Sequence, residues 1–293
     1  MDQSLVTINI LSFNRKDELR NTLTKVYEQD YKNIEVIVVD NASTDGSPEL
    51  VEREFPEVKL IRLQSNIGIA GWNEGFKIAK GEYVLVLDDD AYPASNALIE
   101  ALKEFSNEEV ACITMNLKDL RNGNYYDGDW LPKEKNEKRY WPIFVGCAFI
   151  VMIKRLPTTF RFPDKYFLYQ HELPMAAEIY SNNKKILFSP EILAYHNFKE
   201  HTGYKVFSDS SAFRNNLNFI CSYLPKRLMI FYFLQSVIFY LSRSLRHKWF
   251  SEYKKIILQN KFWLKSRPIR FQYFVQLRPL HLFNYPLWSK IFK

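Results

Sequence analysis

The sequence predicts an α/β fold, with a mostly parallel sheet covered by helices on both faces and a C-terminal helical appendage. In the first 200 residues, apolar runs of strand length alternate with segments whose apolar residues recur at helical spacing. The charge is unevenly distributed. Residues 225–293 contain 14 Lys and Arg against one acid, a net +13, while the whole chain carries +7, which leaves about −6 for residues 1–224. At 293 residues, the chain is long enough for one large domain and a smaller region with a different role.

The first half of the chain predicts a regular alternation of strands and helices. Strands are expected at residues 5–11, 34–39, 58–63, 83–87 and 110–115. Helices are expected at residues 19–28, 47–55, 72–79 (with residues 66–71 leading into it) and 98–105. Ser47 followed by Pro48 is a favourable N-cap and first-turn pair for the second helix, and Gly81 is expected to end the third.

Beyond residue 115 the alternation is interrupted. Residues 118–142 are polar and rich in turn formers, which predicts a long loop over a site on the sheet. The rest of the domain is expected to consist of a strand at 144–153, a helix at 173–180, a strand at 185–188 and a final segment at 192–196. We therefore expect a first domain over residues 1–205 and a basic, aromatic-rich helical region over residues 206–293.

The acidic triplet Asp88-Asp89-Asp90 directly follows five apolar strand formers, so it lies where a buried strand ends. Like charges this close raise one another's pKa unless a positive group lies between them. A hard divalent cation is a natural partner, and it could in turn bind phosphate oxygens. The alternative is a solvated acidic turn that caps the next helix. Because open α/β sheets bind ligands at the carboxyl ends of their strands, we favour the ligand site.

Five motifs in order resemble the family 2 glycosyltransferases, which have the GT-A (Rossmann-like) fold and use nucleotide-sugar donors. These motifs are Val38–Gly46, Asn66-Ile67-Gly68, Leu87–Asp90, Gly146-Cys147-Ala148 and Ile192–His196. The resemblance covers about residues 4–200. The Asn-x-Gly stretch running into a helix is most similar to the rhamnosyltransferase and galactofuranosyltransferase branch.

The resemblance implies roles for individual residues. The expected nucleotide and donor contacts are Ser12, Asn14, Arg15, Asp40, Asn41, Ser43, Asp45, Asn66, Gly68, Asp88 and Asp89. Asp40 would accept a hydrogen bond from a uracil or thymine imide. The expected acceptor or donor pocket residues are Trp72, Trp141, Gly146 and His171. Asp90 and His196 would bind Mn²⁺ or Mg²⁺, which would neutralise the leaving nucleoside diphosphate.

The catalytic base is expected to be Glu172. In the family an acidic pair at a helix start ends in the Asp that deprotonates the acceptor hydroxyl, whereas this sequence has His171-Glu172. A Glu can perform the same proton abstraction. Three alternatives stay open: Glu172 only stabilises the helix N-terminus, residues 40–46 form a turn without a ligand, and His196 has a structural role.

The basic region interleaves Lys and Arg with aromatic residues, a pattern typical of interfacial membrane binding. The apolar stretch 228–241 is too short for a confident transmembrane span. Nucleic acid is not an expected partner because no nucleic-acid-binding motif accompanies the basic residues. The alternative is packing on the first domain or on a second copy, as a homodimer. Three cysteines in apolar contexts favour a reduced compartment, and no signal peptide is expected. The expected location is cytoplasmic, peripheral on the inner face of the membrane.

The combined expectation is an inverting, metal-dependent hexosyl- or rhamnosyltransferase. It would move a sugar from a UDP- or dTDP-sugar to a hydroxyl acceptor, expected to be a lipid-linked cell-surface glycan. A nucleotidylyltransferase is the alternative enzyme, but it would need a glycine-rich loop after the first strand, and Ser12–Arg15 lacks glycines. A non-catalytic membrane adaptor with a degenerate transferase domain is the third hypothesis, and only the His171-Glu172 departure favours it.

Overall fold

The computed structural model describes residues 4–128, 130–198, 205–246 and 248–259. The strands are β1 (Val6–Ser12), β2 (Ile34–Asp40), β3 (Lys59–Arg62), β4 (Tyr83–Asp88), β5 (Ala91–Pro93), β6 (Val110–Asp119), β7 (Arg139–Tyr140), β8 (Ala148–Met152) and β9 (Lys185–His196). The α-helices are α1 (Lys16–Tyr27), α2 (Ser47–Glu54), α3 (Trp72–Ile78), α4 (Ala97–Glu104), α5 (Glu172–Ser181), α6 (Lys205–Tyr223), α7 (Lys226–Arg246) and α8 (Phe250–Gln259). Two short 3₁₀ helices lie at Gly68–Gly71 and Ile153–Arg155.

The described strands form one sheet in the order β3-β2-β1-β4-β8-β6-β9-β5. The short strand β7 pairs antiparallel with β9 at Leu187 and Phe188. The first four strands are parallel, as predicted. Beyond β4 the sheet is mixed, because β8 runs antiparallel to both β4 and β6. The chain reaches β8 through the long segment after β6 rather than through a helical crossover, so it can enter the sheet in the reverse direction. The α/β class is confirmed, with an antiparallel strand inserted beside the central one.

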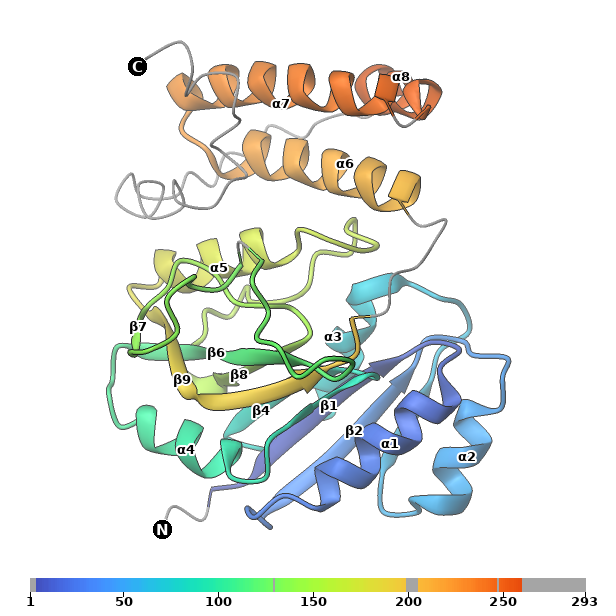
Figure 1. Cartoon of the computed structure of the whole chain (residues 1–293), viewed down its shortest axis with the longest axis vertical. Helices are drawn as coiled ribbons and strands as arrows, with labels where there is room; N and C mark the ends of the chain where they lie inside the picture. The colour runs from blue at the N-terminus through green and yellow to red at the C-terminus, as the bar shows by residue number, and fades with distance from the viewer. Residues whose placement is uncertain (1–3, 129, 199–204, 247, 260–293) are drawn as a thin grey trace.

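Helices cover both faces of this sheet (Figure 1). Helices α1, α2 and α4 bury Leu19, Leu50 and Leu98 against one face. Helices α3 and α5 bury Trp72 and Leu173 against the other. Strands β1 and β4 are buried on both faces. β4 is apolar up to Asp88, which made it recognisable in the sequence, whereas β1 alternates apolar residues with the buried polar residues Thr7 and Asn9.

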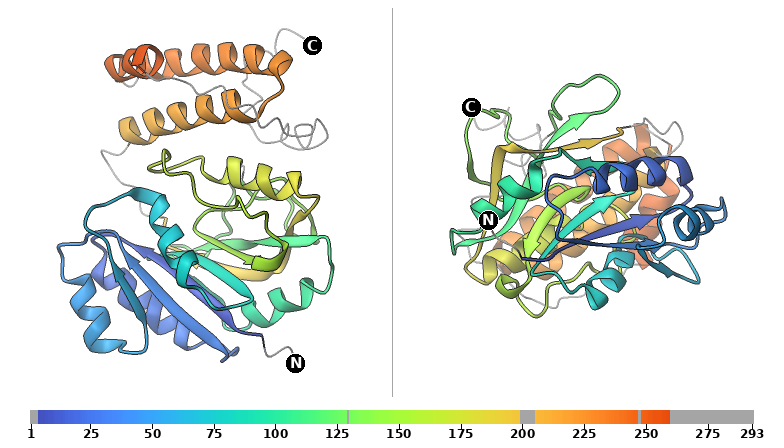
Figure 2. Two further views of the ribbon diagram at one scale, coloured as in Figure 1. Left: turned by 180° about the vertical axis from the view of Figure 1, so that it is seen from behind. Right: turned by 90° about the horizontal axis from the view of Figure 1, so that it is seen from below.

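The C-terminal helices form a further layer beyond α5 (Figures 1 and 2). Phe219 and Ile220 of α6 belong to the same apolar core as the buried side chains of α5. Phe213 and Leu217, also on α6, pack instead with Tyr240 of α7 and residues of α8. Helix α6 therefore joins the sheet domain to the outer helices. The division at residue 205 stays a prediction.

Helix α7, with 21 residues, is longer than the apolar stretch 228–241. Its segment Leu228–Arg246, 19 residues with a mean hydropathy of 1.4, is long and apolar enough to cross a membrane by length and composition. Core helices of soluble proteins pass the same test, so length and composition alone do not place α7 in a bilayer. Many basic and aromatic residues of the tail, from Lys261 onward, lie outside the described residues.

Several predicted boundaries differ from the observed ones. Gly46, not Ser47, occupies the N-cap of α2, and the side chain of Asp45 accepts the Ser47 N–H in its place. Helix α3 ends at Ile78, before Gly81. The strand predicted at 185–188 continues through the segment 192–196 as one strand, β9, with an irregularity opposite Met115 and Asn116. The loop predicted at 118–142 begins after Asp119, because β6 continues to that residue.

Candidate active site

The acidic triplet lies at the carboxyl end of β4, in the middle of the sheet. Asp88 ends the strand, and Asp89 and Asp90 follow it with only 4% and 6% of their surface exposed. Asp89 accepts hydrogen bonds from the Phe13 N–H and from the Arg15 guanidinium, each at 3.1 Å. It therefore fixes the loop after β1. The solvated acidic turn that the sequence left open does not describe these two buried carboxylates.

Asp90 lies between two cationic side chains. Its Oδ2 is 2.6 Å from Nη1 of Arg15, and its Oδ1 is 3.1 Å from Nε2 of His196. Burial would raise the pKa of Asp90, but the hydrogen bond from His196 and the charges of His196 and Arg15 hold that pKa below its usual value. Burial lowers the pKa of His196, and its pairing with Asp90 outweighs this and raises it. The Asp90 carboxyl group is therefore ionised at pH 7.

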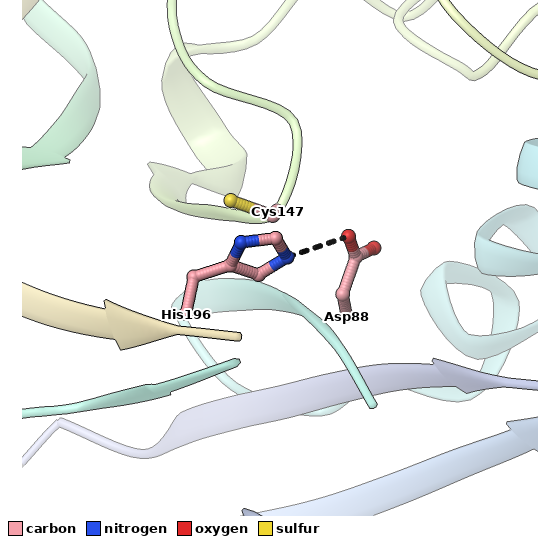
Figure 3. A group of neighbouring side chains, drawn as sticks. All are labelled: Asp88, Cys147 and His196. Atoms are coloured by element: carbon pink, nitrogen blue, oxygen red, sulfur yellow. Dashed lines mark ion pairs between the residues drawn. The ribbon is translucent and has the colours of Figure 1, made fainter. Parts of the chain in front are cut away.

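Asp88 faces a second group of potential metal ligands. One ligand atom each of Asp88, Cys147 and His196 lie within 4.8 Å of one another, and Figure 3 shows the three side chains meeting above the sheet. Burial, reinforced by the charge of Asp90, raises the pKa of Asp88 to about 6. Burial and the nearby carboxylates raise the pKa of the Cys147 thiol well above its usual value, so this thiol stays protonated.

These residues fit a hard divalent cation. Carboxylate oxygens and an imidazole nitrogen suit Mn²⁺, whereas a protonated thiol is a poor ligand. In the described structure the charge of Asp90 is balanced by Arg15 and His196. A cation bound by Asp88, Asp90 and His196 would compete with Arg15 for the Asp90 carboxylate.

The loops after β1 and β2 are tied together by side chains predicted to contact the donor. The Asn14 N–H donates to Ser43 Oγ, and Asn14 Oδ1 accepts the Thr44 N–H. Asp45 accepts N–H groups from Lys16 and Ser47, at the starts of α1 and α2. The structure thus brings Asn14, Ser43 and Asp45 together, and their hydrogen bonds fix the conformation of the two loops.

Two buried oxygens in these loops are available to a ligand. Asp40 accepts the Ser43 N–H through Oδ2, while its Oδ1 is buried without a hydrogen-bond partner among the described residues. Ser12 Oγ, at the end of β1, is likewise buried without a hydrogen-bond partner among the described residues. Because a buried polar atom without a partner is unfavourable, a donor N–H from a ligand at Asp40 would relieve that cost.

The Asn66–Gly68 segment connects the donor loops to the segment that precedes α5. Asn41 donates to the Gly68 carbonyl and accepts the Ile67 N–H. Gly68 has a φ of 64°, and a Cβ there would lie 2.0 Å from the carbonyl oxygen of Phe167. Only glycine fits at this position. Asn41 and Asn66 therefore organise the backbone, Asn66 by accepting the Gly68 N–H.

Glu172 is the first residue of α5 and lies beside His171 and Gly146, with 12% of its side-chain surface exposed. A Cβ on Gly146 would lie 2.7 Å from Glu172 Oε1 and 2.6 Å from His171 Nε2. Burial raises the pKa of Glu172 to about 7, against the opposing effect of the Gly146 N–H. Burial lowers the pKa of His171 to about 4, so its ring is neutral at pH 7. A carboxyl group with a pKa near 7 is well matched to a general base.

The two tryptophans that were expected in the pocket are largely occupied by the protein itself. Trp72 is 2% exposed, donates its Nε1–H to the Leu87 carbonyl, and packs against Phe162 and His171. It supports His171 from the core side and leaves almost no surface for a sugar. Trp141 donates to the Trp130 carbonyl and anchors the loop before β8.

The family model described as "Glycosyl transferase family 2" matches residues 7–158, just over half of the chain. The chain belongs to this family. The matched segment contains β1 to β8 and includes both donor loops, the acidic triplet and Gly146, whereas Glu172 and His196 lie beyond it. This membership argues against the nucleotidylyltransferase alternative.

Two relatives of this family 2 member come from Escherichia coli. They are the UDP-Glc:alpha-D-GlcNAc-diphosphoundecaprenol beta-1,3-glucosyltransferases WfaP and WfgD. WfaP is 34% identical over 109 residues, which cover 36% of this chain and 43% of WfaP. WfgD is 26% identical over 177 residues, 58% of this chain and 70% of WfgD. The chain thus matches less than half the length of WfaP.

Solved structures of similar fold include two with bound donors. The Pyrobaculum calidifontis mannosyltransferase PcManGT, in complex with GDP-Man and Mn²⁺, covers 98% of this chain and 88% of its own, with 20% identity and a TM-score of 0.61. TarS 1–349 of S. aureus with UDP-GlcNAc covers 87% and 81%, with 18% identity and a TM-score of 0.62. At these identities the likeness establishes the GT-A fold of the family 2 member.

Two features of this family 2 site were not assigned from the sequence. Cys147 was recognised only as part of a motif, but the structure places its thiol near Asp88 and His196, and burial together with the charges of Asp88, Asp90 and Glu172 raises the pKa of that thiol. Arg15 pairs with Asp89 and Asp90, a contact that the sequence did not indicate, and its expected contact with the donor stays a prediction. The sequence around a single basic residue in a loop does not indicate which acidic residue will form an ion pair with it.

Proposed function

We propose that this chain is an inverting glycosyltransferase that moves a sugar from a nucleoside diphosphate sugar to a hydroxyl of a lipid-linked glycan. The observation that carries the proposal is the position of Gly146-Cys147. On one side the thiol faces Asp88 and His196, and on the other Gly146 contacts Glu172. A base and a cluster of potential metal ligands therefore face one small volume, as a single displacement requires.

The proposed donor is a UDP- or dTDP-sugar. The support is the buried Asp40 Oδ1, which can accept the imide N–H of uracil or thymine. The E. coli relatives are named for UDP-Glc and the TarS complex contains UDP-GlcNAc, while PcManGT contains GDP-Man. The rhamnosyl or galactofuranosyl type stays a prediction, since neither E. coli relative is named for it.

In the proposed reaction, the Glu172 carboxylate accepts the proton of the acceptor hydroxyl as its oxygen attacks the anomeric carbon. The bond from that carbon to the diphosphate oxygen breaks, and the nucleoside diphosphate leaves with the electron pair. One base on the attacking side is enough for this inversion. The neutral His171 ring packs beside Glu172, its Nδ1 3.6 Å from Glu172 Oε2, and adds no opposing charge.

Asp88, Asp90 and His196 would bind Mn²⁺ or Mg²⁺ in this proposal. The cation would supply electrostatic stabilisation of the leaving diphosphate. Asp89 holds Arg15 and the Phe13 backbone next to this site, so its contribution is to keep the loop after β1 in place.

The first test measures donor binding and turnover by the intact chain. We expect UDP- or dTDP-sugars with Mn²⁺ to raise the melting temperature, because a ligand that binds only the folded state stabilises it. We also expect slow donor hydrolysis without acceptor and faster release of nucleoside diphosphate with a diphosphoundecaprenol-linked sugar. EDTA should abolish the rise in melting temperature and both kinds of donor turnover. Donor binding without any turnover on lipid-linked or free glycans would favour the non-catalytic adaptor.

The proposal includes peripheral contact with a membrane through α7. Ile230, Leu234, Ile238 and Leu245 are 54–62% exposed and recur at helical spacing, so they form one apolar stripe. The opposite face of α7 packs on α6, where Asn216 donates to Ser236 Oγ and Arg243 pairs with Asp209. These polar contacts favour a helix that lies along α6 and faces lipid on one side. The inner-face, cytoplasmic location stays a prediction, as does the homodimer.

Charge at both ends of the stripe favours an anionic lipid surface as its partner. Lys226 precedes the stripe, and Arg246 and Lys248 follow it, all three exposed. Each Lys or Arg near an anionic leaflet contributes roughly 1 kcal/mol, a contribution that salt screens, whereas buried apolar area contributes a part that salt does not weaken.

We expect the full chain to sediment with anionic vesicles and high salt to release only part of it. The triple variant Ile230→Gln, Leu234→Gln, Ile238→Gln should lose most vesicle binding and keep donor binding. Ile78→Gln with Ile153→Gln is the matched control, since both are exposed apolar residues outside the helical layer. Unchanged vesicle binding by the triple variant would overturn the proposal. A change from dimer to monomer in lipid-free solution would assign the stripe to a second copy.

A further inference from the structure

The backbone just before the proposed base has an unfavourable conformation. Tyr169 and Gln170 have φ values of 66° and 61°, two consecutive left-handed residues that are not glycine. Such residues persist only where their surroundings hold them, and they cluster at functional sites. Here they immediately precede His171 and Glu172, so their turn sets the direction in which the chain enters α5.

Three successive carbonyl groups hold this turn in place. The Phe167 carbonyl accepts the Ile69 N–H at 2.9 Å. The carbonyls of Leu168 and Tyr169 both accept the Nδ2 group of Asn215, each at 2.8 Å. Ile69 belongs to the segment after the donor loops, whereas Asn215 comes from α6, 46 residues after Tyr169.

Asn215 is itself fixed by the segment that it holds. Asn215 is 2% exposed, and its backbone carbonyl oxygen accepts the Tyr166 hydroxyl at 2.9 Å. Figure 1 shows α6 lying directly over α5 and the loop that leads into it. Helix α6 and residues 166–169 are thus joined by three buried or partly buried hydrogen bonds in both directions.

We propose that Asn215 is a positioning residue of the transfer reaction. By holding the Leu168 and Tyr169 carbonyls, it fixes the left-handed turn that places Glu172 beside Gly146. This inference rests on the proposed function, because it assigns Glu172 the role of base. The tolerance is small, since Gly146 has no room for even one extra carbon beside Glu172. The C-terminal helical region therefore takes part in building the catalytic centre.

The test compares two neighbouring asparagines on α6. Asn215→Ala and Asn215→Asp both lose the N–H donors, and the Asp variant keeps the shape of the side chain. Asn216→Ala is the control, because Asn216 is equally buried but faces α7, where it donates to Ser236. We expect both Asn215 variants to lower kcat about 10–100-fold with an unchanged donor KM, because a misplaced base slows only the chemical step. The control should keep its kcat.

Hydrogen exchange of the intact, ligand-free chain separates this inference from the proposed function. Residues 166–172 should exchange faster in Asn215→Ala than in wild type, and at the wild-type rate in Asn216→Ala. If the wild type lacks transferase activity, the proposed function fails and exchange alone decides whether Asn215 holds the turn. Wild-type kcat and exchange in both Asn215 variants would overturn the inference. An equal loss of kcat in Asn216→Ala would also overturn it, since the effect would then be a general one on α6.

Discussion

Glu172→Gln is expected to reduce sugar transfer by about 10²–10⁴-fold or more. The amide keeps the size of the carboxylate and its place beside Gly146, but it cannot accept the proton of the acceptor hydroxyl. Donor binding should remain near wild type, because Glu172 starts α5 and the predicted nucleotide contacts lie in the loops after β1 and β2. Transfer to a lipid-linked acceptor and calorimetric binding of UDP or dTDP with Mn²⁺ measure the two quantities separately.

The pH dependence of wild-type transfer provides a second measure of the same carboxyl group. The pKa of Glu172 is raised by burial to about 7, so the group is protonated and inactive as a base below that pH. Transfer should therefore fall about tenfold per pH unit below about 7 and level off above it. His171→Gln is the control, because the His171 ring is already neutral in this range. If Glu172→Gln keeps normal turnover and His171→Gln loses it, His171 is the base.

The parts of the fold that were predictable are those in which local pattern and burial agree. Strands β2 and β4 are nearly uninterrupted apolar runs, and β1 is apolar-rich apart from Thr7 and Asn9. The polar residues at their carboxyl ends lie at one edge of the sheet, as parallel strands require. The antiparallel entry of β8 was not predictable, because its apolar sequence is compatible with either direction. The full length of α7 was missed, since its polar ends continue the helix beyond the apolar stretch.

Site residues were predictable where they belong to a sequence motif. They were not predictable where only a tertiary contact gives them their role. Asp40, the acidic triplet and Glu172 come from such motifs, although their roles stay proposals. Asn215 lies in a helix of mixed polarity, and nothing in its neighbourhood indicates that it reaches two carbonyls before α5. Trp72 shows the reverse case, because an aromatic residue within a motif serves mainly to support His171 from the core.

Asp90→Asn is expected to abolish the dependence of nucleotide binding on Mn²⁺. His196 and Arg15 hold the pKa of Asp90 below its usual value, so its carboxyl group is ionised and able to bind a divalent cation. Loss of a residue that only supports a metal ligand costs about 10–100-fold in affinity, and loss of a direct ligand should cost at least as much. Calorimetric titration of UDP or dTDP with and without Mn²⁺ should give similar affinities for the variant and very different ones for the wild type.

Asp119→Asn is the matched control for this measurement. Asp119 pairs with His196 in the register of β6 and β9, and it is a mostly buried aspartate whose charge is already balanced by Arg121. The Asp119→Asn variant should keep the metal dependence of nucleotide binding, because the Asp119 carboxylate is already paired with Arg121.

Asp89→Asn should have an intermediate effect on metal dependence, since an amide oxygen can still accept the Phe13 N–H but pairs weakly with Arg15. A metal dependence that survives in Asp90→Asn would show that Asp90 is no ligand and that its ion pairs with Arg15 and His196 are structural.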